Sequence, residues 1–280
     1  MEGVIFTNIL QEFDAGDLYT RYAVEEKPDD RDFTMHVHEC CEIFYFVSGE
    51  AAYLVEGSRY LLQSGDIMIM RSAESHRTKI LGRSRYERYV INFSPTMIDN
   101  IDPQRRLLKA FFDRPLGRGN LYSSLELDKI QLKTIFHDVC CCDRDDYGRR
   151  VKALTNLFML LDAINDAYLK RGTADDTPPR SLSEQMVAYV NIHLFEELSV
   201  PILAKQFFLS PSQFSRNFKH ATGAAPWEYI TIKRLTAARE KIRGGETAQH
   251  AGESCGFGDY SAFYRAYIKC FGCPPKNDSI

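Results

Sequence analysis

The sequence predicts an α+β multidomain chain, in which a small N-terminal β-barrel with flanking helices precedes a C-terminal domain that is all α. Short apolar segments separated by turn residues run from about residue 33 to 93, which is typical of a sandwich or small barrel. Further on, apolar residues recur at helical spacing. A polar segment with Gly and Pro, residues 171–181, interrupts that pattern. We therefore expect domains at 1–170 and 182–280, joined by this linker.

Length and composition indicate a folded protein with room for two domains. The chain has 280 residues, of which 44% are hydrophobic and 26% are charged. Its start, MEGVIFTNIL, lacks the basic residues and long apolar run of a signal peptide. No stretch approaches the roughly 18 apolar residues of a membrane span. We therefore expect a cytoplasmic protein with no membrane partner.

The eight cysteines are expected to be free thiols. Their spacing is not that of a disulfide scaffold, and a chain without an export signal stays in a reducing compartment. Cys270 and Cys273 have a ligand-like spacing, but no second pair stands at zinc-ribbon distance, so thiols are favoured over zinc. Cys140 to Cys142 lie in an apolar helical pattern, which favours buried thiols.

The distribution of charge says more than the net charge of −3. Residues 181–280 carry a net charge of +2, whereas residues 1–180 carry −5. Within 203–243 there are 8 basic residues and 2 acidic ones. A basic stretch inside an acidic protein is a candidate surface for the phosphates of a nucleic acid.

The strands of the N-terminal domain are predicted from aromatic and β-branched residues between turn signals, such as those at Gly49, Gly57 and Gly65. The predicted strands are EIFYFV, AAYLVE, RYLL, DIMIM and YERYVINF. Two helices are predicted after them, at DPQRRLLKAFF and LDKIQLKTIFHDVCC.

A third helix, Arg149 to Lys170, has the strongest pattern in this half of the chain. Its apolar stripe is wider than one contact with a core requires. We therefore expect a homodimer that pairs through this helix, with Leu157 and Leu161 in the seam. A purely intramolecular role is the alternative. The stripe consists of Val151, Leu154, Leu157, Phe158, Leu161, Ile164 and Tyr168.

Two helices of the C-terminal domain are predicted to start in the same way. Ser199 and Ser210 each stand as a cap before a proline in the first turn. Two helices joined by so tight a turn have the layout of a helix-turn-helix. The buried stripe of the first helix is expected to be Leu203, Ala204, Phe207 and Phe208.

The second helix separates a buried face from a polar one. Phe214 and Phe218 lie four residues apart on the buried face. Ser212, Gln213 and Arg216 point elsewhere. An arginine offers a two-pronged donor to guanine and a glutamine does the same for adenine, so this face is a candidate reader of DNA bases.

The aromatic-x-Arg-x-aromatic pattern around Arg216 recurs 49 residues later around Arg265. One such match is usually an amphipathic helix with a solvated arginine, but two copies after tight turns favour a pair of reading helices. Between them Pro226 to Arg243 is predicted as one helix of about 27 Å. That length approaches one turn of B-DNA, roughly 34 Å, so two helices could enter successive major grooves.

On these motifs, residues 182–276 resemble the AraC-type DNA-binding domain. The matching segments are LAKQFFLSPSQFSRNFKHATG, PWEYITIKRLTAAREKI and CGFGDYSAFYRAYIKCFGCPP. The resemblance implies seven helices, two helix-turn-helix motifs and double-stranded promoter DNA as partner. By position it implies base contacts from Ser212, Gln213 and Arg216 in the first recognition helix, and from Tyr260, Ser261 and Arg265 in the second.

Four positions depart from the family pattern. Ala248 and His250 stand where two large aliphatic residues are usual, which predicts looser packing of the second unit. Ala225 and Cys273 stand where a Ser or Thr cap precedes proline. Each of these two helix starts loses a side-chain acceptor, a loss of about 1 kcal/mol.

A cluster of ligand-type residues is predicted in the N-terminal domain. On a strand, His36, His38 and Glu42 have the same parity and would face one way. His76 follows a second turn and strand. Three imidazoles and one carboxylate suit Zn, Mn, Fe or Ni. The pattern resembles a cupin barrel over residues 33–94, with a complete first motif and a second one that departs from the family at Arg71, Ala73 and Ile80.

Cupins joined to AraC-type domains are generally sensors, so the resemblance implies an effector pocket at His36, His38, Glu42 and His76. A sugar or its derivative is the favoured occupant, because Tyr45, Tyr53 and Tyr60 could add apolar faces with hydroxyl groups. A divalent metal at the same four residues is the alternative. A pocket filled by neighbouring side chains stays open.

Two functions follow from different halves of the sequence. The favoured one is a ligand-responsive, sequence-specific DNA-binding transcription regulator of carbohydrate or small-metabolite genes, with no catalytic residues. The rival is a metal-dependent cupin enzyme, a sugar isomerase or dioxygenase, whose helical tail only dimerises. The enzyme hypothesis requires an intact metal motif and no paired helix-turn-helix. The sequence has a paired helix-turn-helix pattern and a second cupin motif that departs from the family, which favours the regulator.

Overall fold

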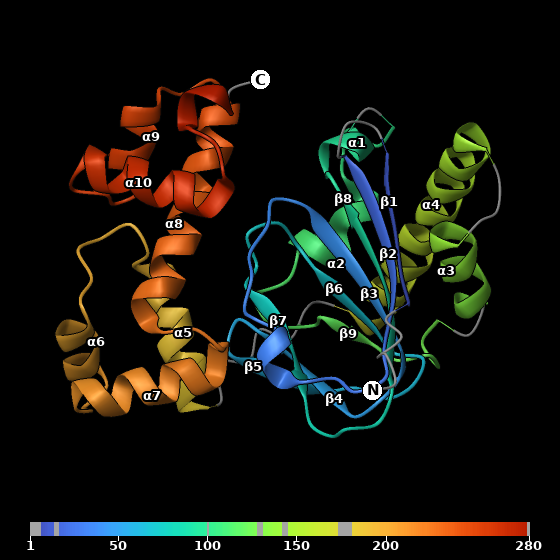
Figure 1. Cartoon of the computed structure of the whole chain (residues 1–280), viewed down its shortest axis with the longest axis horizontal. Coiled ribbons are helices and arrows are strands. Elements are labelled where there is room, and N and C mark those ends of the chain that lie inside the picture. The colour runs from blue at the N-terminus through green and yellow to red at the C-terminus, as the bar shows by residue number, and fades with distance from the viewer. Residues whose placement is uncertain are drawn as a thin grey trace, which may run out of the picture.

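The computed structural model describes residues 7–13, 17–99, 101–127, 131–141, 145–172 and 181–278. Figure 1 shows two parts, a sheet-containing part (residues 7–172, the sheet domain) on the right and a helical part (residues 181–278, the helical domain) on the left. Most of the expected linker, residues 173–180, lies outside the described residues. Within the described ranges, no helix has the length and apolar character needed to cross a membrane.

Two antiparallel sheets make up the sheet domain. The larger has the order β1-β2-β8-β3-β6-β9 and the smaller β5-β4-β7. β4 and β7 pair with each other and not with the larger sheet. The strands therefore do not form the closed barrel that was predicted from the sequence. The strands are β1 (Thr7–Phe13), β2 (Leu18–Glu25), β3 (Cys41–Ser48), β4 (Ala51–Val55), β5 (Ser58–Leu61), β6 (Ile67–Met70), β7 (His76–Ile80), β8 (Tyr86–Phe93) and β9 (Leu121–Tyr122).

All five predicted strands form, as β3, β4, β5, β6 and β8. β1 and β2 were not predicted, because polar and charged residues interrupt their apolar pattern. β3 is buried on both faces along most of its length. One face packs against helices and the other lies between the sheets, which explains its continuous apolar run.

Short helices and one long helix cover the outer face of the larger sheet (Figure 1). The helix expected at DPQRRLLKAFF is reduced to a 3-10 turn, Arg106–Leu108, followed by one α-turn. A further 3-10 turn spans Asp30–Asp32. The α-helices are α1 (Thr96–Asp99), α2 (Lys109–Phe112), α3 (Leu132–Cys140) and α4 (Asp146–Arg171).

Helix α4 buries the residues on which the dimer seam was predicted. Leu157 and Leu161 are both 0% exposed and belong to the core shared with the larger sheet. The prediction that they form a seam between two copies is therefore wrong, because the stripe fills the core of its own domain. The exposed apolar residues of α4 include Tyr147, Val151 and Met159.

The helical domain contains two helix pairs separated by a long helix. Ser199 caps α6 and Ser210 caps α7, each with proline in the first turn, as predicted. The long predicted helix forms as α8 over the residues expected. The helices are α5 (Leu182–Ile192), α6 (Val200–Gln206), α7 (Pro211–Thr222), α8 (Pro226–Arg243), α9 (Ala248–Ser254) and α10 (Tyr260–Phe271), followed by a 3-10 turn, Pro275–Asn277.

The expected buried stripe of α6 is correct at Leu203 and Ala204 but wrong at Phe208. The helix ends at Gln206, and Phe208 has a left-handed φ of 55° and is 98% exposed. The chain reverses here within a few residues to start α7, so Phe208 leaves the helix surface and projects into solvent.

Candidate functional site

The two predicted recognition helices are α7 and α10, and each is anchored by an aromatic pair. Phe214 and Phe218 are 0% exposed in α7, and Phe263 and Tyr267 are 0% exposed in α10. Each pair lies in a separate apolar core of the helical domain. Because the aromatics fix the inner face, the opposite face of each helix lies at the surface.

On α7 the three predicted base-reading residues are exposed, but they differ in what they contact. Gln213 completes a capping box, in which its Oε1 accepts from the Ser210 backbone N at 3.0 Å. Ser212 Oγ lies 3.3 Å from Ser210 Oγ. Arg216 is exposed in the middle of the helix and is the residue of the three best placed to reach a base edge.

On α10 the predicted residues Tyr260, Ser261 and Arg265 are also exposed. Asp259 caps this helix and accepts from the backbone N atoms of Ser261 and Ala262, at 3.2 Å and 2.8 Å. Asp259 therefore stabilises the first turn of α10, and the exposed Arg265 lies in the next turn.

The second helix-turn-helix, α9 with α10, has its own packed core despite the departures from the family pattern. His250 has a side chain that is 70% exposed, so it contributes little to packing, and Ala248 is only partly buried. Gly252 allows Phe263 to pack closely, since an added Cβ would lie 3.1 Å from its ring. At Ala225 the side-chain acceptor of the cap is absent, as expected, and the other half of a capping box is present, in which Glu228 Oε2 accepts from the Ala225 N at 3.4 Å.

Sequence reasoning missed Arg234, which joins the two helix-turn-helix units. This α8 residue is 4% exposed, and its guanidinium donates to three backbone carbonyls. The acceptors are Leu194 at 2.7 Å, Glu196 at 2.6 Å and Gly256 at 2.7 Å. Two acceptors lie before α6 and one precedes α10. A basic residue inside the buried stripe of α8 was the available signal.

In the sheet domain, His36, His38, Glu42 and His76 come together. Their potential ligand atoms all lie within 4.8 Å of one another. His38 Nε2 is 3.2 Å from Glu42 Oε2, and His76 Nε2 is 3.6 Å from the same oxygen. We call these four residues the histidine cluster. They are the one such group with metal-ligand chemistry within the described ranges.

The histidine cluster is assembled differently from the single strand expected. Glu42 lies in β3 and His76 begins β7. His36 and His38 lie in the extended segment before β3, where His36 forms an isolated bridge with His76. The side chains converge because this segment crosses to the smaller sheet.

Backbone carbonyls orient all three imidazoles. The Nδ1 atoms of His36, His38 and His76 bind the carbonyls of Thr34, Cys40 and Glu74 at 3.1, 2.9 and 2.7 Å. With Nδ1 donating, a neutral ring carries its lone pair on Nε2, the atom that would face a metal. His76 Nε2 is buried and has no hydrogen-bond partner among the described residues. This arrangement is typical of imidazoles that ligate a metal.

Electrostatics keep Glu42 ionised although it is buried. Burial alone would raise the pKa of this carboxyl, but His76 and His38 outweigh burial and hold the pKa well below its usual range. Burial opposes charge on His76, but Glu42 outweighs it and raises the pKa of this ring. Tyr53 donates to Glu42 Oε1 at 2.8 Å. Burial, with Glu42, raises the pKa of Tyr53, so it stays a donor.

A cavity of about 640 Å³ adjoins the histidine cluster. His36, His38 and Glu42 line it, and Tyr53 adds an aromatic wall. Sequence reasoning missed most of the lining. The clearest available signal was Arg88, a charged residue within an apolar strand. The other lining residues include Tyr19, Arg21, Lys27, Asp32, Phe33, Phe44, Thr78, Val90 and Asn92.

Tyr45, predicted in the pocket, lies on the other face of the sheet. Its ring stacks on Phe136 of α3 with centroids 4.8 Å apart. Residues of β3 alternate between faces, so Tyr45 has the opposite parity to Glu42 and Phe44. Tyr60 also points elsewhere, donating to the Gly117 carbonyl at 2.7 Å. The seven cysteines within the described ranges are free.

Known proteins resemble both halves of the chain. Residues 19–142 match the AraC-like ligand binding domain, and residues 203–278 match a helix-turn-helix domain. The HTH-type transcriptional activator RhaS of Escherichia fergusonii is 25% identical over 262 residues, which cover 91% of this chain and 90% of that protein. RhaS of Salmonella arizonae is 25% identical over 263 residues with the same coverage.

Among solved structures, ToxT from Vibrio cholerae matches at 14% identity, with a TM-score of 0.38 over 93% of this chain and 96% of that one. The two matched domains occur in the order in which the sheets and the helix-turn-helix units occur here. The chain belongs to the AraC-type transcription regulators, and is a ligand-responsive, sequence-specific DNA-binding protein with a sheet-containing ligand-binding domain and a C-terminal helix-turn-helix domain.

Proposed function

We propose that this regulator senses a small polar metabolite, a sugar or its derivative, which binds in the cavity beside a divalent transition metal. The histidine cluster would hold the metal, and the observation that carries the proposal is the buried, unpartnered Nε2 of His76 facing Glu42. Three imidazoles and a carboxylate suit Zn, Mn, Fe or Ni. When bound, such an ion supplies open coordination positions for ligand oxygens.

The cavity has the mixed lining that sugars require. Phe44 and Tyr53 offer aromatic faces, which pack against the apolar side of a sugar ring. Arg88 and Asn92 offer polar groups on the same wall. Arg88 is 6% exposed and is paired with Glu25, so the polar wall is held in place before a ligand arrives.

We also propose that the histidine cluster serves sensing and not catalysis, and that the protein works in the cytoplasm on promoter DNA. The arrangement of α7 and α10 with exposed arginines supports a DNA-binding output. The rival, a metal-dependent isomerase or dioxygenase, would use the same four ligands. It predicts turnover of sugar substrates by the metal-loaded protein, whereas we expect none under conditions in which the metal changes DNA binding.

The experiment is metal binding by isothermal titration calorimetry with the full chain. Wild type is expected to bind one Zn²⁺ per chain, and His76→Ala to lose that binding. His137→Ala is the matched control, because His137 is exposed on α3, away from the histidine cluster. Thermal-shift screening of sugars with the metal-loaded protein then identifies the metabolite. Equal zinc affinity in wild type and His76→Ala would contradict the proposal.

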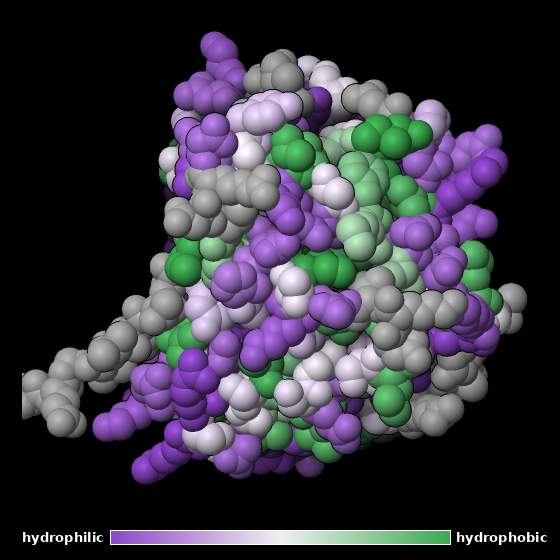
Figure 2. Space-filling view, turned by 90° about the vertical axis from the view of Figure 1, so that its right-hand side faces the viewer, coloured by the Kyte–Doolittle hydropathy of each residue, from purple (hydrophilic) through white to green (hydrophobic). Residues whose placement is uncertain are grey.

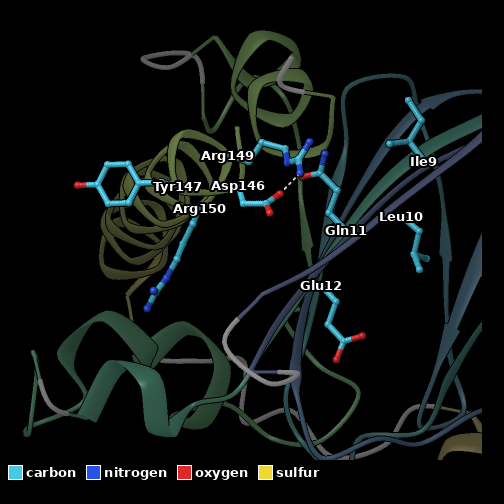
Figure 3. A pocket seen from close by; sticks show the side chains of 8 residues that line it. All are labelled: Ile9, Leu10, Gln11, Glu12, Asp146, Tyr147, Arg149 and Arg150. Atoms are coloured by element: carbon cyan, nitrogen blue, oxygen red, sulfur yellow. Dashed lines mark hydrogen bonds and ion pairs between the residues drawn. The ribbon is translucent and has the colours of Figure 1, made fainter. Parts of the chain in front are cut away.

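We propose a homodimer that uses the outer surface of α4 and β1 in place of the buried stripe. A groove of about 690 Å³ lies between the edge strand β1 and the start of α4 (Figure 3). Leu10 and Tyr147 line it and are 53% and 77% exposed. Asp146 pairs with Arg149 within this groove, and Glu12 and Arg150 add charges of both signs, which suits a surface that faces its own copy across a two-fold axis.

This side of the molecule, viewed in Figure 2, has green apolar side chains scattered among purple polar ones. A mixed interface of that kind depends on a few apolar anchors. Leu10→Glu with Tyr147→Glu is therefore expected to give a mass of one chain by light scattering. Leu125→Glu, a change at an exposed leucine elsewhere in the sheet domain, should leave the dimer intact. A dimeric double variant would place the interface elsewhere.

A further inference from the structure

Two backbone segments of the sheet domain contact the histidine cluster on one side and the helical domain on the other. The first is residues 34–40. His36 and His38 point to the cluster, and Met35 lies in an apolar core with helical-domain residues such as Val187 and Ile230. Val37 packs against the same core. In an extended segment alternate residues face opposite ways, so a shift of the histidines moves their neighbours too.

The second segment is residues 72–76, the loop that leads into β7. Its Ala73 N donates to the His38 carbonyl at 2.9 Å, and its Ala73 carbonyl accepts from Lys233 Nζ of α8 at 2.8 Å. The backbones of His36 and His76 exchange two hydrogen bonds of 3.0 Å. Ala73 adopts a left-handed φ of 59°, which is uncommon for a residue with a side chain. The surrounding contacts therefore determine the shape of this loop.

Glu56, between β4 and β5, connects this loop to the helical domain. Its Oε1 accepts from the Ser75 N at 2.7 Å and from Lys233 Nζ at 2.6 Å. Its Oε2 accepts from Asn191 Nδ2 at 2.6 Å and from the Tyr229 hydroxyl. The side chains of Glu56 and Lys233 are 1% and 5% exposed. A buried ion pair of this kind depends strongly on its geometry, because either charge alone is costly to bury.

The other end of α8 is held by the first segment. Glu39 Oε2 lies 2.5 Å from Arg243 Nη1, and Glu39 Oε1 lies 3.6 Å from Arg239 Nε. Helix α8 carries one helix-turn-helix at each end. The middle of α8, at Lys233, and its C-terminal end, at Arg243, are therefore attached to segments that also carry residues of the histidine cluster.

We propose that the Glu56–Lys233 ion pair is a latch which docks α8 on the sheet domain, and that ligand binding at the histidine cluster opens it. The inference rests on the proposed function, since it needs a ligand at the histidine cluster. Opening the latch frees the helical domain to place α7 and α10 on DNA. By linkage, ligand and DNA then raise each other's affinity by the same factor.

The direction follows from geometry. Neighbouring donors on one ion stand roughly 3 to 3.5 Å apart at metal–ligand distances near 2.1 Å. The four ligand atoms lie within 4.8 Å of one another, and His38 and His76 already stand 3.2 and 3.6 Å from Glu42, so a bound ion needs only a small contraction, which we expect the extended segment with His36 and His38 to supply. Met35, Val37 and Glu39 point the other way, and this movement pulls them from the helical domain.

The test is the affinity of the full chain for its upstream promoter DNA, measured by fluorescence anisotropy with and without Zn²⁺, alongside calorimetric zinc binding. For wild type we expect about a tenfold gain in DNA affinity on adding zinc, within the range usual for coupled sites. Glu56→Gln combined with Lys233→Met removes both charges, so no lone charge stays buried. It should bind zinc, and bind DNA without zinc as tightly as wild type does with it.

The control is Lys241→Met, on the same helix, where the side chain contacts Ser254 and not the sheet domain. It should retain the full zinc response. If the double variant binds zinc and still shows the wild-type response, the latch is refuted while the metal site stands. Zinc bound by wild type without any change in DNA affinity also refutes it. If wild type binds no zinc, the proposed metal-dependent function fails, and this inference fails with it.

Discussion

Replacing Arg234 by methionine should unfold the helical domain far more easily while removing no residue that faces DNA. The guanidinium is buried in α8 and donates to the carbonyls of Leu194, Glu196 and Gly256 at 2.6 to 2.7 Å. Methionine fills much of the same volume but donates nothing. Three carbonyls, two between α5 and α6 and one between α9 and α10, would lose their partner.

The size of the effect can be worked from these contacts. A hydrogen bond to a charged group contributes about 1.5 to 3 kcal/mol. We take the low end, because the variant also no longer buries a charge. Three bonds at about 1.5 kcal/mol amount to roughly 4.5 kcal/mol of lost stability, which is large against the 5 to 15 kcal/mol of a typical domain.

The assay is urea unfolding of the full chain followed by circular dichroism, which reports helix content. Arg216→Met is the matched control, because it makes the same exchange at an exposed position. That variant should unfold like wild type within about 0.5 kcal/mol. If Arg234→Met also unfolds like wild type, the three carbonyl contacts do not hold the two units together and the reasoning is refuted.

Three further predictions concern DNA, the metal and the domain contact. Arg216→Ala should weaken binding to the cognate promoter by about 1 to 3 kcal/mol in mobility shifts, and Arg265→Ala should weaken it less; equal losses on random DNA would mean that they only touch phosphate. Tyr53→Phe removes the donor to Glu42 and should weaken calorimetric zinc binding about tenfold; unchanged affinity would contradict a positioning role. Gly57→Ala should lower the urea midpoint, because Gly57 has a φ of +84° and an added Cβ would lie 2.9 Å from Val187. An unchanged midpoint would show that this contact between the domains is not strained.

Most of the fold could be predicted because apolar periodicity is local. A few neighbouring residues are enough to predict the strands β3 and β8 and the helix caps at Ser199 and Ser210. Whether the sheets close into a barrel could not be predicted, because closure depends on which strands pair, and β7 pairs with β4. The exposure of Phe208 was missed for a similar reason, as a single left-handed residue ends a helix early.

The histidine cluster was predicted because three of its residues have a metal-like spacing within a short segment and His76 follows a second turn and strand. Of its surroundings, Tyr53 was predicted, whereas Arg88 was missed because it reaches the cavity from another strand. Parity along β3 could have excluded Tyr45. The contact between Glu56 and Lys233 joins residues 177 positions apart, and nothing in the local sequence around either one indicates the other.

The most direct test of the account is the affinity of the full chain for its own promoter, measured by fluorescence anisotropy while free Zn²⁺ is varied, in wild type and in His76→Ala. The account predicts that zinc raises the affinity of wild type for the promoter about tenfold, with no such change for a scrambled sequence. It predicts that His76→Ala does not respond. A zinc response of equal size in His76→Ala, or none in wild type, would contradict the claim that the histidine cluster controls DNA binding.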